Sequence, residues 1–212
     1  MNSNKDLIVL TADKDAKEAL EALLPRNDSL SIRSITYDIF SHPLHDPGVY
    51  KAASDFLRVF SSQYHYCLVV FDHEGSGQEE SPASNLVETI KGKLKQNGWE
   101  NRSEVIVLKP ELEIWIWVDS LHTAHAIGWE NYHDLKNWLV KRGWWEKDSL
   151  KPEKPKEAFR EALKEKRIPP SSSIFREIGE KVSFQRCADP SFEKLRQTLK
   201  KWFPKNIELR EV

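Results

Sequence analysis

The sequence predicts an α/β fold in which helices flank a mostly parallel sheet and a helical C-terminal extension follows. Short apolar runs alternate with amphipathic segments through the first half of the chain. Two of these runs, at residues 7–10 and 66–70, are continuously apolar, as expected for parallel strands buried on both faces. The second half has mainly helical patterns. Together these features predict a layered domain with a helical addition.

The elements of the first half are expected in the order β-α-β-α-β-α-β. The expected strands are residues 7–11, 32–38, 65–71 and 104–108. Apolar residues at helical spacing predict the connecting helices, which are residues 14–24, 49–60 and 85–96. Crossover helices of this kind join parallel strands and cover both faces of the sheet.

Five further helices are expected in the second half, where Pro-containing segments separate several of them. They are residues 121–126, 132–140, 156–165, 174–180 and 192–202. The linkers between them are short, which favours packing on the sheet over an independent second domain. We therefore expect an α/β domain over residues 1–128 and a helical extension over residues 129–212, packed on the same domain.

The composition is that of a globular protein, with 212 residues of which 39% are hydrophobic and 31% charged. No apolar stretch approaches the roughly 20 residues that span a bilayer. The first residues carry no apolar signal-peptide core, and two cysteines do not make a disulfide framework. The sequence therefore predicts a cytoplasmic protein without a membrane partner.

Charge is unevenly distributed along the chain, whose net charge is −1. The first 140 residues contain 13 Lys and Arg against 21 Asp and Glu, whereas the remainder contains 19 against 12. A basic half beside an acidic half fits a protein that acts on phosphates. Solvated helix faces explain the same counts, so both interpretations stay open.

Acidic residues follow two of the predicted strands. Asp72 and Glu74 come at the end of residues 65–71 and, being two apart, point the same way on an extended chain. Asp13 and Asp15 follow the first strand in the same manner. Carboxyl ends of parallel strands share one edge, and carboxylates are ligands of Mg²⁺ and Mn²⁺. These four acids predict a divalent-metal site; the alternative is that they cap helices and form turns, as Asp13 would before Lys14.

A group of aromatic and basic residues in the second half predicts a contact surface. It consists of Lys141, Arg142, Trp144 and Trp145. Aromatic side chains beside Lys and Arg can stack on bases and hold phosphates, so we expect an exposed surface for nucleic acid or a protein partner. Packing between the extension and the sheet is the alternative for such tryptophans.

Three motifs together resemble the Toprim superfamily: an acidic end of the first strand, the acid-x-acid pair Asp72/Glu74, and the Pro-Glu-x-Glu-x-Trp segment that starts at Pro110. Within it, the chain is similar to small stand-alone Toprim proteins of bacterial genomes, which are related to the nuclease domain of the overcoming-lysogenization-defect enzymes. Residues 183–192 resemble the closing segment of those small proteins. The chain also resembles a small subunit of the methylation-associated defence system.

The resemblance implies a Toprim-like sheet, a bound Mg²⁺ or Mn²⁺, and phosphodiester cleavage of the nuclease type in a bacterial antiphage defence system. It assigns catalytic roles to Asp72, Glu74 and Glu113. Two positions depart from the family pattern, because Glu74 replaces an Asp and Asp13 or Asp15 replaces a Glu. The alternative is therefore a non-catalytic scaffold subunit that docks a larger nuclease, methylase or ATPase. Other defence subunits, DNA or RNA, and a second copy of the chain all stay open as partners.

Overall fold

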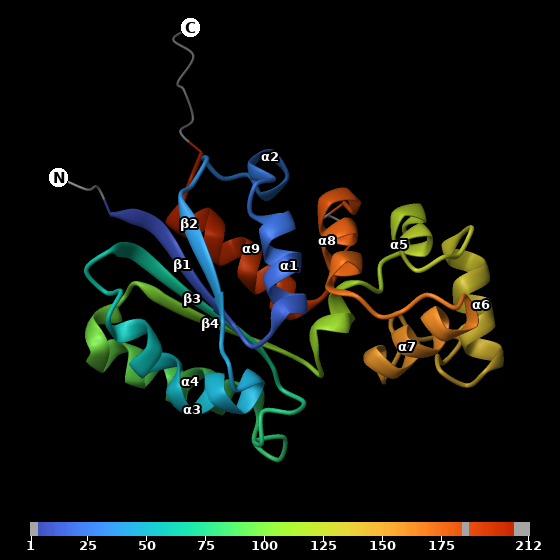
Figure 1. Cartoon of the computed structure of the whole chain (residues 1–212), viewed down its shortest axis with the longest axis horizontal. Helices are drawn as coiled ribbons and strands as arrows, with labels where there is room; N and C mark the ends of the chain where they lie inside the picture. The colour runs from blue at the N-terminus through green and yellow to red at the C-terminus, as the bar shows by residue number, and fades with distance from the viewer. Residues whose placement is uncertain (1–3, 184–186, 206–212) are drawn as a thin grey trace, which may run out of the picture.

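The computed structural model describes residues 4–183 and 187–205, and the strands in these ranges form a four-stranded sheet in the order β2-β1-β3-β4 (Figure 1). Every pairing is parallel, which confirms the predicted α/β class with a parallel sheet. The strands are β1 (Lys5–Thr11), β2 (Tyr37–Ser41), β3 (Tyr64–Asp72) and β4 (Ser103–Leu108). Phe184, Gln185 and Arg186, which belong to the closing segment of the resemblance, lie outside the described residues.

Alternate residues of the central strands fill two separate apolar clusters, one on each face of the sheet. In β1, Leu7 and Val9 belong to one cluster, whereas Ile8 and Leu10 belong to the other. All four side chains are fully buried. This two-sided burial explains why the strand appears in the sequence as an unbroken apolar run.

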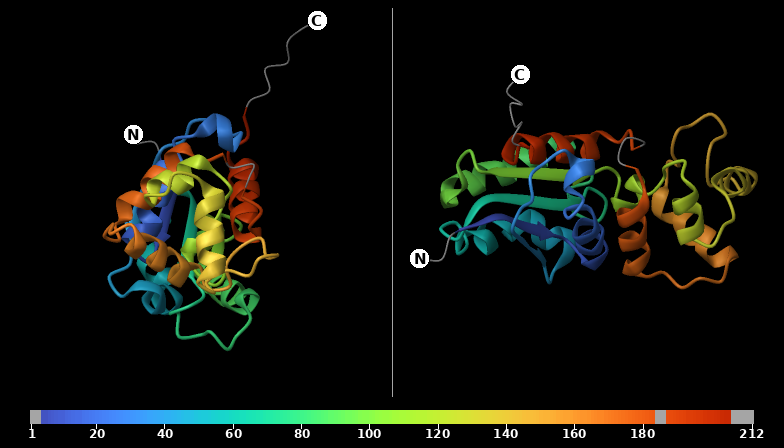
Figure 2. Two further views of the ribbon diagram at one scale, coloured as in Figure 1. Left: turned by 90° about the vertical axis from the view of Figure 1, so that its right-hand side faces the viewer. Right: turned by 90° about the horizontal axis from the view of Figure 1, so that it is seen from above.

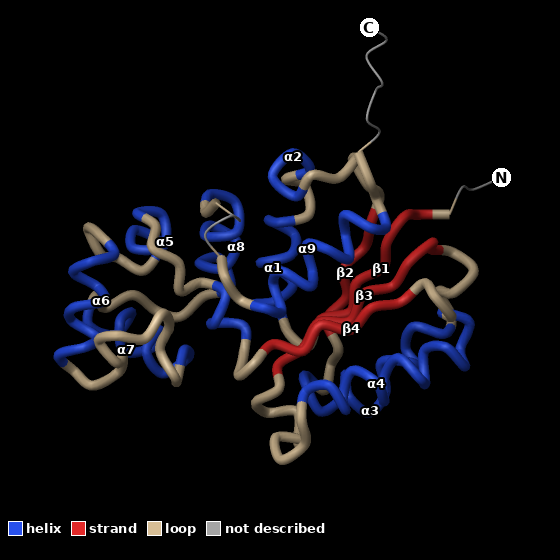
Figure 3. Tube along the Cα trace, turned by 180° about the vertical axis from the view of Figure 1, so that it is seen from behind, coloured by secondary structure: helices blue, strands red, loops and turns tan. Residues whose placement is uncertain are grey.

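Helices cover both faces, giving three layers (Figure 3). One face carries α1 (Lys14–Leu23) and α9 (Pro190–Trp202), and the other carries α3 (His45–Arg58) and α4 (Ala83–Leu94). A single turn, α2 (Asn27–Leu30), follows α1, and a π-helical turn, η1 (Lys95–Trp99), extends α4. The last described helix thus returns to the sheet and packs beside β4.

The strand order places a switch point between β1 and β3. From β1 the chain moves outward to β2, crosses back over β1 to reach β3, and then continues to β4 in the opposite direction. Open α/β sheets bind their ligands outside the carboxyl ends of the strands at such a reversal. Here that position lies beyond Thr11 and Asp72, the last residues of β1 and β3.

The helices between β4 and α9, called the extension from here on, lie beyond this carboxyl edge of the sheet (Figure 2). A short 3-10 helix, η2 (Leu112–Trp115), leads from β4 into it. The helices that follow are α5 (Leu121–Ala126), α6 (Tyr132–Lys141), α7 (Pro155–Glu165) and α8 (Ser172–Lys181). Helix α8 packs on α1, where Gly179 faces Ala22 closely enough that an added Cβ would lie 2.9 Å from its methyl group.

One predicted strand is displaced from its true position. Residues 32–38 were expected to form the second strand, but β2 spans Tyr37–Ser41. Ile32 instead forms an isolated antiparallel bridge with Pro204, and Ile35 packs against the apolar cluster of the α1 face. The apolar spacing in this segment therefore reflects packing outside the sheet.

Among the described residues, no helix combines the length with the apolar character that crossing a bilayer would require.

Candidate metal centre

The loops that follow β1, β2 and β3 deliver acidic side chains to the carboxyl edge of the sheet. Asp72 is the last residue of β3, and Asp13 and Asp15 follow β1. Asp46 lies in the first turn of α3, just beyond β2. Because the three strands are parallel neighbours, these side chains lie at one edge of the sheet.

The segment after β4 brings two more carboxylates to the same place. The N–H of His73 donates to Leu108 O at 2.8 Å, and the N–H of Glu74 donates to Pro110 O at 2.9 Å. These bonds extend the pairing of the two chain segments past the ends of β3 and β4. The chain then turns into η2, which places Glu111 and Glu113 beside Asp72.

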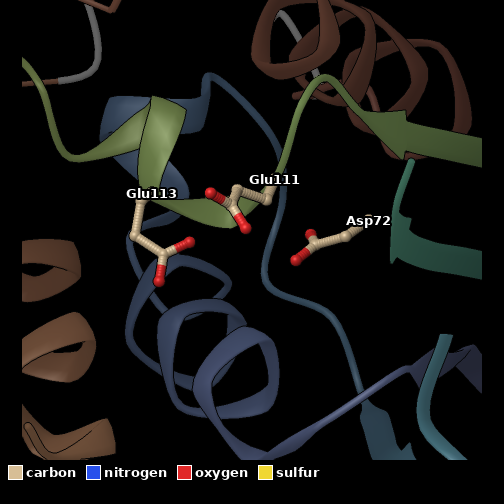
Figure 4. A group of neighbouring side chains, drawn as sticks. All are labelled: Asp72, Glu111 and Glu113. Carbon is tan, nitrogen blue, oxygen red and sulfur yellow. The ribbon is translucent and has the colours of Figure 1, made fainter. Parts of the chain in front are cut away.

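Asp72, Glu111 and Glu113 form a compact buried group, called here the acid cluster (Figure 4). Each offers one carboxylate oxygen, and these oxygens all lie within 4.8 Å of one another. The exposed fractions of the residues are 8%, 5% and 5%. In Figure 4 the carboxylates of Asp72 and Glu113 point inward from opposite sides, with Glu111 between them. An oxygen donor set of this kind is suited to a hard divalent cation.

Burial and mutual repulsion disfavour the charged forms of this cluster. Burial raises the pKa of Asp72 well above its usual value, and the nearby negative charges of Asp46 and Glu113 raise it further. Burial also raises the pKa of Glu113, to about 7, with the charge of Glu111 adding to the rise and that of Lys156 opposing it. A bound cation would relieve both effects.

No hydrogen bond to the Asp72 carboxyl is found among the described residues, although its own backbone N–H donates to Asp46 Oδ1 at 2.7 Å. A buried carboxylate without a donor is costly unless a proton or a cation satisfies it. The residues present therefore fit a metal ion in two respects, the oxygen donor set and the Asp72 carboxyl, which accepts no hydrogen bond from the described residues. The acid cluster can bind a metal ion.

Asp13 and Asp15 lie next to the acid cluster without being part of it. Asp13 caps α1, since its Oδ1 accepts from the N–H of Ala16 at 2.9 Å. Burial raises the pKa of Asp15, which also feels the charge of Asp13. The capping role considered for Asp13 from the sequence is thus present, and its charge still contributes to the field at Asp72.

Glu74 lies apart from the acid cluster. It is exposed, whereas Asp72 is buried. The strand ends at Asp72, so the alternation that would place both carboxylates on one side does not continue to Glu74. Of the three residues assigned catalytic roles by resemblance, the structure brings together Asp72 and Glu113.

Three charged residues of this site, one in the acid cluster and two next to it, were not among the sequence candidates. Glu111 had a visible signal, because Glu-x-Glu after a strand repeats the acid-x-acid spacing seen at Asp72. Asp46 follows a strand whose predicted position was displaced. Lys156, from α7, forms an ion pair with Glu111, with 3.0 Å between Nζ and Oε2. Its approach depends on how the extension packs, which no local pattern in the sequence specifies.

The predicted contact surface is only partly exposed. Trp145, expected to be exposed, is 3% exposed and stacks edge-on against Trp117 with ring centroids 5.2 Å apart, so that expectation is wrong. Trp144 is partly buried against the same apolar cluster. Lys141 and Arg142 are exposed, and the Arg142 guanidinium lies 5.2 Å from the centre of the Trp138 ring. Packing of the extension, the alternative raised from the sequence, accounts for Trp145.

The centre is thus a three-carboxylate cluster at the switch point of a parallel sheet, with a lysine from the extension beside it. No protein-family model, curated protein or solved structure matches the chain.

Proposed function

We propose that the protein is a divalent-metal-dependent phosphodiesterase of the nuclease type. The observation that carries this proposal is the convergence of three buried carboxylates at the switch point of the sheet. Asp72, Glu111 and Glu113 would hold Mg²⁺ or Mn²⁺, both of which prefer carboxylate oxygens and keep open positions for water and substrate phosphate. Such an ion polarises a phosphoryl oxygen and makes bound water a better nucleophile near neutral pH.

The remaining acids act on the site through position and charge. Asp46 holds the backbone of Asp72 by its 2.7 Å hydrogen bond and so fixes where the β3 carboxylate is presented. Asp13 and Asp15 add negative potential, which attracts a divalent cation to this edge of the sheet. Asp72 ends a strand of the sheet, and the other acids lie in or next to the first turns of short and long helices that follow the strands.

Nucleic acid is the proposed substrate, in either DNA or RNA form. The surplus of Lys and Arg from Lys141 onward supports this, since phosphate backbones are held mainly by positive side chains. The resemblance to the Toprim superfamily supports the same chemistry. It is also the sole basis for the wider proposal that the protein works in the bacterial cytoplasm as a component of an antiphage defence system with other subunits.

A second candidate function is that of a non-catalytic subunit that docks a larger nuclease, methylase or ATPase. The specific observation in its favour is the ion pair between Lys156 and Glu111, because a lysine that neutralises the acid cluster makes a metal less necessary. The outward position of Glu74 supports it as well. The two functions differ in whether the isolated protein takes up a metal ion.

Calorimetric titration with Mn²⁺ tests this difference on the full chain. The wild type is expected to bind, and Asp72→Asn and Glu113→Gln are each expected to weaken binding by more than about tenfold, since each removes a charged oxygen ligand. Glu74→Gln is the matched control, because it makes the same change at an exposed acid outside the cluster. It is expected to bind as the wild type does.

The outcomes separate the candidate functions. Absence of Mn²⁺ binding by the folded wild type would refute the hydrolase proposal for this chain and favour the docking subunit. Binding that Glu74→Gln weakens as much as Asp72→Asn would mean that the ion sits elsewhere. If binding follows the acid cluster, cleavage of single-stranded and duplex DNA and RNA is then assayed with Mn²⁺, with Asp72→Asn as the inactive control.

A further inference from the structure

A single residue of the extension engages both carboxylate oxygens of Glu111. The backbone N–H of Lys156 donates to Oε1 at 3.2 Å, and its Nζ donates to Oε2 at 3.0 Å. Glu111 is the middle carboxylate of the acid cluster in Figure 4. One carboxylate of the acid cluster is therefore hydrogen-bonded to the first turn of α7.

Helix α7 depends on this contact for the start of its hydrogen bonding. Its N-cap residue is Lys154, whose side chain caps no backbone group. The first N–H groups of a helix have no partner within the helix and need one from elsewhere. Glu111 supplies that partner to Lys156, so a carboxylate after β4 performs the capping role that a local Ser or Asp performs in other helices.

The same lysine brings the positive charge to the acid cluster. Its Nζ lies 3.0 Å from Glu111 Oε2, which places the ammonium beside the three carboxylates of the cluster. A divalent cation entering the cluster would meet both the repulsion of this charge and a Glu111 whose oxygens are already bonded.

We propose that Lys156 is a latch that couples metal loading to the docking of the extension. This inference rests on the proposed metal site. Without metal, Lys156 pairs with Glu111 of the acid cluster and holds the first turn of α7 against it. When a metal ion takes Glu111 as a ligand, the ion displaces Lys156, and the start of α7 loses its tertiary cap. The docking of α7 therefore depends on whether a metal ion is bound at the acid cluster.

Mn²⁺ titration of four full-length proteins tests the competition. Lys156→Met removes the ammonium but keeps an aliphatic side chain, and it is expected to bind Mn²⁺ more tightly than the wild type by a factor of about 5 to 150, the usual range for coupled events. Lys156→Arg retains the charge and should bind like the wild type. Lys164→Met is the matched control, because Lys164 is an exposed lysine of the same helix that pairs with Glu161.

Hydrogen exchange of the wild type tests the release directly and requires no variant to fold. The amide of Lys156 is expected to be protected in the metal-free protein and to exchange faster when Mn²⁺ is bound. Unchanged or greater protection with Mn²⁺ would overturn the latch. Equal or weaker Mn²⁺ binding by a folded Lys156→Met would overturn it as well.

The failures of the two proposals can be told apart. In one outcome, the wild type binds Mn²⁺, Lys156→Met binds it with the same affinity, and the Lys156 amide exchanges at the same rate with and without Mn²⁺. That outcome refutes the latch and leaves the metal site standing. If Lys156→Met binds Mn²⁺ and the wild type does not, the latch is supported, because Lys156 then blocks the site outright, and the hydrolase proposal for the wild-type chain is refuted. If no variant binds, the metal site is refuted and the latch with it.

Discussion

The backbone N–H of Asp72 donates to Asp46 Oδ1 at 2.7 Å. This hydrogen bond joins two acidic residues whose negative charges repel each other. Asp46 is one of the negative charges that raise the pKa of Asp72. Burial raises the pKa of Asp46 itself. Asp46 therefore positions the end of β3 and also destabilises the charged form of the Asp72 carboxyl. A bound cation would relieve this repulsion.

Substitution of Asp46 can separate its hydrogen bond from its charge. Asp46→Asn keeps an oxygen that accepts from Asp72 N–H and removes the repulsion, so the metal-free protein is expected to become more stable by about 1 kcal/mol near neutral pH. Asp46→Ala loses the acceptor and should be less stable than Asp46→Asn by about 1 kcal/mol. Urea unfolding in the presence of a chelator measures both. A less stable Asp46→Asn would show that the charge of Asp46 is favourable in the fold.

The pKa of Glu113 predicts that the metal-free protein loses stability as pH rises. The carboxyl titrates at about 7 in the folded protein and near 4.5 when unfolded. Between these values the folded state keeps a proton that the unfolded state has released, so the free energy of unfolding falls with rising pH, by up to about 3 kcal/mol from this group. The wild type should therefore be more stable at about pH 5 than at about pH 8 when a chelator is present.

The control for this pH dependence is again Glu74→Gln, which should keep the wild-type difference. Glu113→Gln should reduce it, because glutamine does not titrate. Chemical unfolding of the three proteins at the two pH values gives the comparison. A wild type that is more stable at the higher pH would contradict the assignment of a buried, destabilising carboxyl at position 113.

Trp145 is expected to act on stability, since its side chain lies inside the extension. It packs against Trp117 and Tyr132, and its Nε1–H donates to Ser149 O at 3.1 Å. Trp145→Ala should lower the free energy of unfolding by about 3–5 kcal/mol, the usual cost of removing a large buried aromatic side chain. Trp144→Ala, at the partly buried neighbour, should cost less. Equal losses in urea unfolding would contradict the difference in burial.

Gly179 is predicted to be required for the close contact of α8 with α1. A Cβ at this position would lie 2.9 Å from Ala22 Cβ and 3.2 Å from Ala19 O. Gly179→Ala should therefore destabilise the protein by about 1–3 kcal/mol through overpacking. Gly92→Ala is the matched control in α4, where a Cβ meets no atom within 4 Å. That change should stabilise the protein by about 0.5–1 kcal/mol through helix propensity, and thermal unfolding compares the two.

Much of the fold follows from local patterns in the sequence. The central strands are apolar runs because both faces of the sheet are covered, and β1 and β3 lie within a residue or two of their expected positions. Helices such as α5, at Leu121–Ala126, begin and end as expected. Strand β2 was misplaced because it is short and lies at an edge, where only Ile39 is buried within the strand and alternation is weak.

The candidate site was less accessible from sequence, because it depends on which strand ends are neighbours. Asp72 was found since it ends an obvious buried strand. Glu111 and Asp46 come to the site from segments that are held by hydrogen bonds, one at Pro110 and one to Asp72. No local pattern in the sequence reveals these hydrogen bonds. Trp145 was misjudged because the charged residues beside it in sequence, Lys141 and Arg142, point away from the core while it points inward.

Helix α9 determines when the protein can complete its core during synthesis. It supplies Phe192, Leu195 and Leu199 to the apolar cluster on the α1 face of the sheet. During translation, all four strands and the whole extension are synthesised before α9. Until α9 is made, the part of the α1 face that it covers stays exposed in the nascent chain. The sheet therefore finishes folding late, and the interval before α9 emerges is when a chaperone would find apolar surface to hold.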